Sequence, residues 1–247
     1  MVDSKKLAFF LPNTFTALNM ACGFASIMMS YQGEFYKGCL ILILGAIFDS
    51  VDGRVARMTG TQSSFGEQFD SLSDLISFGM APAFLVYNQF LTGMGRLGYV
   101  VAFIYVLCGA LRLARFNANI DKVSSDFFQG LPIPGAALAV IGYVLFSIEF
   151  PQLIEFKIVA AVYTVFYALL MISNIPFFSF KNSELVKKNK KLALVIIFLL
   201  LTLIFLYDQL MMAIIMGLYV FASLIYFFKV RGRLDEIFNW TSDEQES

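Results

Sequence analysis

Long apolar segments separated by short polar ones follow one another along almost the whole chain. A transmembrane helix needs about 20 consecutive, mostly apolar residues, and the pattern supplies about eight candidates. They lie near residues 14–31, 35–57, 67–90, 97–116, 134–149, 153–173, 191–207 and 209–228. The sequence therefore predicts an all-α protein, a polytopic bundle of about eight transmembrane helices.

The composition agrees with this pattern and excludes several functions. The chain has 247 residues, of which 59% are hydrophobic and only 15% charged, which is far more apolar than a soluble domain. Its 18 basic and 18 acidic residues cancel, and no basic stripe predicts a nucleic-acid partner. Histidine is absent and the three cysteines are scattered, which excludes histidine acid–base catalysis and Cys/His zinc sites.

The positions of lysine and arginine predict the orientation of the bundle. If both termini are cytoplasmic, all the basic residues fall on the cytoplasmic side except Lys37, Arg96 and Lys157. This bias is the one expected of an inner-membrane protein. It also places the polar stretch of residues 49–74, DSVDGRVARMTGTQSSFGEQFDSLSD, at the cytoplasmic face.

Small and acidic residues in this stretch share one face of two successive helices, because they are spaced three or four apart. They are Asp49, Asp52, Gly53 and Ala56 on the first helix and Gly66, Asp70 and Asp74 on the second. Packed as an antiparallel pair, the two helices would bring four carboxylates to one pocket. The small residues would leave room there for a ligand.

Four clustered carboxylates need cations to stay ionised. Ligation by oxygen alone favours Mg²⁺, Mn²⁺ or Ca²⁺, and such ions commonly neutralise phosphate groups in catalysis. Two other interpretations stay open at this point. The aspartates could form ion pairs with Arg54 and Arg57 that only hold the helices together, or they could line an ion or proton pathway.

The order D-x2-D-G-x2-A-R-x8-G-x3-D-x3-D over residues 49–74 resembles the full signature of the CDP-alcohol phosphatidyltransferase family. Members transfer a phosphatidyl-type group from a CDP-linked donor to an alcohol and release CMP at a divalent-metal site in the membrane. The stretches LPNTFTALNMACGFASI, DSLSDLISFGMAPAF, LRLARFNAN and FQGLPIPGAA are similar to those of bacterial membrane-bound phosphatidylserine synthases. The resemblance covers roughly residues 10–180.

The resemblance implies a role for each position of the signature. Two divalent cations, Mg²⁺ or Mn²⁺, would be held by Asp49, Asp52, Asp70 and Asp74. Asp70 and Asp74 would be the catalytic pair, with Asp74 as the base toward the acceptor hydroxyl. The cytidine diphosphate cleft would be lined by Gly53, Ala56, Arg57 and Gly66, with the paired donors of Arg57 on phosphate.

The resemblance also implies the substrates and the organisation of the chain. CDP-diacylglycerol would be the donor and L-serine the acceptor, in a homodimer embedded in membrane lipids. The alternatives are a glycerol phosphate or inositol phosphate acceptor, an ether-lipid donor and, from another class, a membrane transporter. The predicted units are a catalytic domain, a basic cytoplasmic loop, two additional helices and a polar tail, at residues 1–180, 181–190, 191–229 and 230–247.

Further polar residues at the ends of two spans are candidate substrate contacts. They are Asn13, Thr16, Arg112, Arg115 and Asn117. The arginines and Asn117 could hold the serine carboxylate or a donor phosphate, or the arginines could form an ordinary basic flank. Asn13 could reach the headgroup pocket or only cap the first helix, which Pro12 and Asn13 are expected to open.

Overall fold

The computed structural model describes residues 4–118, 127–178, 199, 202–203 and 206–230. The predicted basic loop 181–190, most of the predicted span 191–207 and nearly all of the tail 230–247 lie outside these residues. The remaining predicted spans are helical, with most ends shifted by a few residues and the start of the first shifted from residue 14 to residue 4. The fold is therefore all-α in character, as the periodicity predicts.

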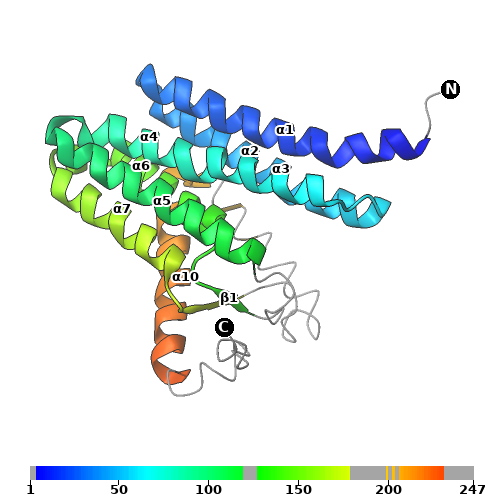
Figure 1. Cartoon of the computed structure of the whole chain (residues 1–247). Coiled ribbons are helices and arrows are strands. Elements are labelled where there is room, and N and C mark those ends of the chain that lie inside the picture. The colour runs from blue at the N-terminus through cyan, green and yellow to red at the C-terminus, as the bar shows by residue number, and fades with distance from the viewer. Residues whose placement is uncertain (1–3, 119–126, 179–198, 200–201, 204–205, 231–247) are drawn as a thin grey trace.

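The first two helices form a long hairpin (Figure 1). Helix α1 covers Ser4–Tyr31 and α2 covers Phe35–Thr59. The turn between them passes through Gly33, whose φ of 78° suits glycine because a side chain is strained there. The two helices pack side by side along most of their length.

The start of α1 differs from the prediction. Pro12 and Asn13 do not open the helix, because it already begins at Ser4 and Pro12 lies inside it. A proline removes its own N–H from the helical ladder, but the residues on both sides can remain helical. The hydroxyls of Thr14 and Thr16 donate to the carbonyls of Phe10 and Pro12, at 2.8 and 3.2 Å.

The third helical run extends from residue 64 to residue 94 and changes its hydrogen-bond pattern along the way. Its parts are α3 (Ser64–Asp74), the π-helix η1 (Leu75–Met80), α4 (Ala81–Val86), the π-helix η2 (Tyr87–Leu91) and the 3₁₀ turn η3 (Thr92–Met94). Ser63 caps its start by accepting a hydrogen bond from the N–H of Gly66 at 3.1 Å. The first π-helical segment thus follows directly after Asp74.

The remaining helices pack mainly in two pairs, and most residues of α6 (Ile133–Glu149) are buried. They are α5 (Arg96–Ala118), α6 (Ile133–Glu149), the 3₁₀ turn η4 (Pro151–Glu155), α7 (Lys157–Ile172) and α10 (Asp208–Val230). Helix α10 crosses α6 closely at Gly142, where an added Cβ would lie 2.8 Å from the backbone nitrogen of Ala213. The small residue permits this close packing.

A short antiparallel sheet, which the sequence analysis did not anticipate, joins the segments after α5 and α7. Strand β1 (Phe127–Gln129) pairs with β2 (Pro176–Phe178), with Phe127 opposite Phe178. The rings of these two residues lie 5.5 Å apart between centroids. Three-residue strands are too short for a pattern to reveal in sequence, so only the packing of the two segments defines them.

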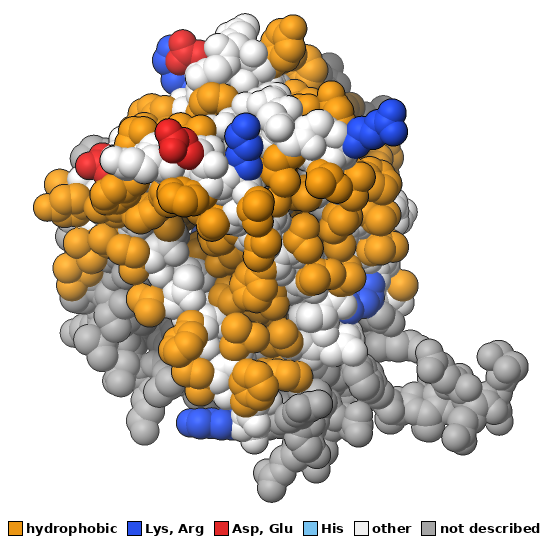
Figure 2. Space-filling model, turned by 90° about the vertical axis from the view of Figure 1, so that its left-hand side faces the viewer, with side chains coloured by type: hydrophobic (Ala, Val, Ile, Leu, Met, Phe, Trp, Pro, Cys, Tyr) orange, Lys and Arg blue, Asp and Glu red, His pale blue; other side chains and the backbone are white. Residues whose placement is uncertain are grey.

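Among the described residues, three helical runs are long and apolar enough to cross a membrane, at Ser64–Met94, Arg96–Ala118 and Gln209–Lys229. The helices at Ile133–Glu149 and Lys157–Ile172 are apolar but shorter. Apolar side chains cover most of the face shown in Figure 2, and the charged ones there are few and scattered. These features indicate a membrane protein.

Candidate active site

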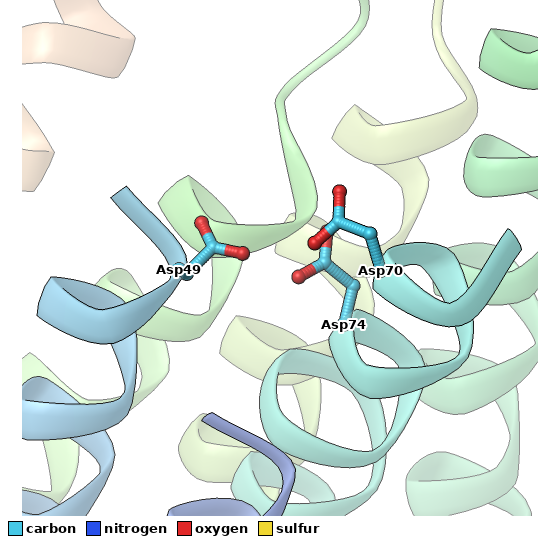
Figure 3. A group of neighbouring side chains, drawn as sticks. All are labelled: Asp49, Asp70 and Asp74. Atoms are coloured by element: carbon cyan, nitrogen blue, oxygen red, sulfur yellow. The ribbon is translucent and has the colours of Figure 1, made fainter. Parts of the chain in front are cut away.

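Three of the four signature aspartates meet where α2 faces α3. Asp49 projects from α2 toward Asp70 and Asp74, which lie one turn apart on α3 (Figure 3). One carboxylate oxygen of each lies within 4.8 Å of those of the other two. Oxygens at such separations can surround one or two hard cations, so this group has the donor chemistry of a magnesium or manganese site.

Asp52 lies one turn further along α2 and stands outside this group of three. It is 5% exposed, and its Oδ2 accepts a hydrogen bond from the hydroxyl of Thr16 at 2.8 Å. Asp52 and Asp70 both line one cavity at the same end of the bundle. The structure thus divides the predicted four carboxylates into a close group of three and a fourth that shares a cavity with Asp70.

No salt bridge neutralises these carboxylates within the described part of the chain. Within the described ranges, none of the four aspartates has a lysine or arginine nitrogen within 4.0 Å, and Lys37–Glu34 is the ion pair found there. The Oδ1 atoms of Asp70 and Asp74 are buried without a hydrogen-bond partner. The interpretation as structural ion pairs with Arg54 and Arg57 is therefore wrong, and the donor set fits bound divalent cations.

The cavity beside the aspartates contains most of the other signature positions. The predicted residues that line it are Asn13, Thr16, Asp52, Gly53, Ala56, Arg57, Gly66 and Asp70. It is also lined by Thr61, Gln62, Ser63 and Glu67. These four were missed because they lie in and just after the turn between the two signature helices, where no periodicity marks them.

The glycines in the cavity wall keep space for its polar groups. An added Cβ at Gly53 would lie 3.7 Å from Nη1 of Arg57, so the guanidinium lies beside this position. An added Cβ at Gly66 would lie 3.3 Å from Oγ of Ser63 and 3.7 Å from Oδ1 of Asn13. The small residues thus leave Arg57 accessible to a ligand in the cavity.

The three polar residues near the end of α5 have different surroundings. Arg115 donates to the carbonyls of Gln129, Met171, Ile172 and Ser173 and to the side chain of Asn174, at 2.9 to 3.4 Å. The amide of Asn117 donates to the hydroxyl of Ser71 at 2.9 Å. Both residues therefore tie helix ends together, and a contact of either with substrate stays a prediction.

Arg112 has a different environment from Arg115. It is 8% exposed, and its guanidinium lies 5.2 Å from the ring centroid of Phe116. Its charge acts on Asp74 without a salt bridge, and no hydrogen bond joins it to another residue in the described part of the chain. A buried guanidinium without an anionic partner is costly, so Arg112 is suited to receive an anion beside the aspartates.

Asn19, which was not among the predicted site residues, contacts Asp49. It is fully buried on α1, and its Nδ2 lies 3.4 Å from Oδ1 of Asp49. It follows Thr16, the partner of Asp52, by three residues and so lies on the same face of the helix. That spacing is a signal that could have identified it.

The model of the CDP-alcohol phosphatidyltransferase family matches residues 9–167 of the chain. The chain belongs to this family. The match includes all the signature residues and α1 from residue 9 onward. Proteins of this family are membrane-bound and generally depend on divalent metal ions, in agreement with the group of aspartates.

Several relatives align over most of this family member. A CDP-diacylglycerol–serine O-phosphatidyltransferase of Helicobacter pylori is 36% identical over 218 residues, which are 88% of this chain and 90% of that protein. A protein of the same name from Methanocaldococcus jannaschii is 41% identical over 167 residues, 68% of this chain and 73% of its own. An archaetidylserine synthase of Methanothermobacter thermautotrophicus is 38% identical over 181 residues, 72% and 74% of the two chains.

Proposed function

We propose that this protein transfers the phosphatidyl group of CDP-diacylglycerol to the hydroxyl of L-serine, forming phosphatidylserine and CMP. The observation that carries the proposal is the serine acceptor in the names of relatives that align over more than two thirds of both chains. The group of aspartates beside a cavity with an accessible arginine is the site that this chemistry requires.

The acidic residues would hold the divalent cations. Asp49, Asp70 and Asp74 supply the close group of oxygens, and Asp52 faces the cavity from α2. Bound Mg²⁺ or Mn²⁺ would neutralise the pyrophosphate of the donor and the charge on the departing CMP. Two cations suit a donor set that is spread over four carboxylates.

The cavity would hold the cytidine diphosphate end of the donor. The guanidinium of Arg57 can donate two parallel hydrogen bonds to phosphate oxygens. Gly53, Ala56 and Gly66 line the same cavity, and larger side chains there would occupy the space of the ligand. This arrangement leaves the scissile phosphorus at the aspartates.

Asp74 would accept the proton of the acceptor. Its Oδ1 is buried and has no hydrogen-bond partner among the described residues, so it can receive a hydrogen bond from the serine hydroxyl. The serine oxygen would form a bond to the phosphatidyl phosphorus while the bond to CMP breaks. The electron pair would leave with CMP and the proton would pass to Asp74, in a single in-line displacement.

Arg112 would bind the carboxylate of L-serine. Replacing it with glutamine is expected to raise the KM for serine about 10- to 100-fold, because a hydrogen bond to a charged group contributes about 1.5–3 kcal/mol. The KM for CDP-diacylglycerol should change little. Arg112→Lys, which keeps the charge but loses the paired donors, should have an intermediate effect.

Steady-state kinetics with each substrate varied in turn will test this assignment. A rise in the KM for the donor alone would place a donor phosphate, rather than serine, at Arg112. Unchanged constants for both substrates would show that neither of them contacts this guanidinium.

The proposed reaction can be tested with the full-length protein purified in detergent. CDP-diacylglycerol and L-serine should give equal amounts of CMP and phosphatidylserine with Mn²⁺ or Mg²⁺, and neither product in EDTA. Release of CMP only with glycerol phosphate or inositol phosphate would agree with the family but would rule out serine as the acceptor. Transport of a solute without CMP release would support the transporter interpretation, which no observation on this chain favours.

We further propose that the protein is an inner-membrane homodimer with its active site facing the cytoplasm. The distribution of lysine and arginine supports this orientation, and the family resemblance supports the dimer. In right-side-out vesicles, a membrane-impermeant maleimide should label a cysteine at Lys37 and not one at Thr61. The reverse labelling would invert the orientation, and a monomer mass in native mass spectrometry would overturn the dimer.

A further inference from the structure

Helix α1 packs against both helices that carry the candidate metal site. Asp49 and Asp52 are on α2, whereas Asp70 and Asp74 are on α3. Both helices pack on α1, but the backbones of α2 and α3 hardly approach each other. The distance between the two pairs of carboxylates therefore depends on how α1 holds each helix.

Two buried serines fix α1 against the helical run that carries Asp70 and Asp74. The hydroxyl of Ser73 donates to the carbonyl of Thr16 at 3.0 Å, and that of Ser77 donates to the carbonyl of Asn19 at 2.9 Å. Both serines are fully buried, so water does not compete for these hydrogen bonds. The backbone of α1 is thus held at Thr16 and Asn19.

The side chains of the same two α1 residues point the other way, to the aspartates of α2. Thr16 donates to Asp52 at 2.8 Å, and Nδ2 of Asn19 lies 3.4 Å from Oδ1 of Asp49. Each residue thus receives a hydrogen bond from the α3–η1 run at its carbonyl and gives one to α2 from its side chain. Together they form two direct bridges across the site.

The oxygen of the Asn19 amide lies close to Gly45 of α2. Among the described residues this Oδ1 has no hydrogen-bond partner although it is buried, and an added Cβ at Gly45 would lie 3.1 Å from this atom. A buried acceptor without a partner costs about 1–3 kcal/mol. The hydrogen bond from the amide nitrogen to the Asp49 carboxylate can offset this cost.

We propose that Asn19 is a positioning residue, which orients the Asp49 carboxylate toward Asp70 and Asp74 for metal binding. The amide occupies one oxygen of Asp49 and leaves the other for the cation. Residues that orient metal ligands in this way commonly change metal affinity about 10- to 100-fold when they are removed. The inference rests on the metal site of the proposed function, but not on serine as the acceptor.

The test is the affinity of the full-length protein for Mn²⁺ in detergent without substrates, followed by the EPR signal of free Mn²⁺. Asn19→Ala is expected to weaken binding about 10- to 100-fold. The matched control is Ser26→Ala, which removes another buried polar group on α1. The Ser26 hydroxyl has no hydrogen-bond partner among the described residues, so this variant should bind Mn²⁺ like the wild type. Raising Mn²⁺ about 100-fold should also restore the turnover of Asn19→Ala, which a folding defect would not allow.

A second variant keeps the test decisive if Asn19→Ala does not fold. Gly45→Ala keeps the amide but places a methyl group against its Oδ1, so it should also weaken Mn²⁺ binding. Unchanged affinity in the folded variants would overturn the role of Asn19. If the wild type binds no Mn²⁺, both the metal site and this inference are overturned. If the variants bind Mn²⁺ more weakly but the wild type does not use serine, only the proposed acceptor is overturned.

Discussion

Replacing Asp70 by asparagine is expected to lower the rate of CMP release by about 10²- to 10³-fold or more. Asp70 is the one aspartate that belongs both to the close group of three and to the cavity wall. Asparagine has nearly the same shape but lacks the negative charge and one metal-binding oxygen. The measurement is the initial rate with CDP-diacylglycerol, L-serine and saturating Mn²⁺.

The control for this prediction is Glu34→Gln. It also removes one carboxylate, at the other end of α2, where Glu34 pairs with Lys37 at 3.0 Å. Exposed ion pairs contribute little to stability, so the rate should equal that of the wild type. If Asp70→Asn keeps a wild-type rate and Mn²⁺ dependence, Asp70 is not a metal ligand in the reaction.

Replacing Gly23 by alanine is expected to destabilise the protein by about 1–3 kcal/mol, the usual cost of overpacking a close contact. An added Cβ would lie 2.6 Å from Oγ and 2.7 Å from Cα of Ser77. The methyl group would push α1 away from η1 and weaken the hydrogen bond from Ser77 to the carbonyl of Asn19. A lower apparent Tm in detergent and weaker Mn²⁺ binding should result.

Gly217→Ala is the matched control, because Gly217 is also a helical glycine and no described residue outside the backbone of its own helix lies within 4 Å of an added Cβ there. Alanine favours the helix over glycine by about 1 kcal/mol, so this variant should be as stable as the wild type or more so. Equal Tm values for the two variants would contradict the close approach of α1 and η1 at Gly23.

The helices and the signature were predictable because each depends on residues that are near one another in sequence. An apolar run of sufficient length favours a helix in a membrane, whatever its neighbours are. Spacings of three and four residues place Asp49 and Asp52, or Asp70 and Asp74, on one face of their helix. The glycines beside them indicate a cavity for the same local reason.

The different environments of Arg112 and Arg115 could not be predicted in this way. The two residues are three apart and share a face of α5, so periodicity treats them alike. Their side chains are long, and the partners within reach decide where each guanidinium lies. Arg115 donates hydrogen bonds to the carbonyls of Met171 in α7 and Gln129 before α6. Arg112 lies over the ring of Phe116, near Asp74.

The sequence by itself determined the all-α architecture, the family and the carboxylates available for metal, because helix periodicity and the signature are local properties of the chain. Only the tertiary structure decided how the carboxylates meet. It set Asp52 apart from the other three and made Thr16 and Asn19 of α1 the link between α2 and α3. The physical reason is that these hydrogen bonds join residues 30 or more apart in sequence, and such distances close only when the helices pack.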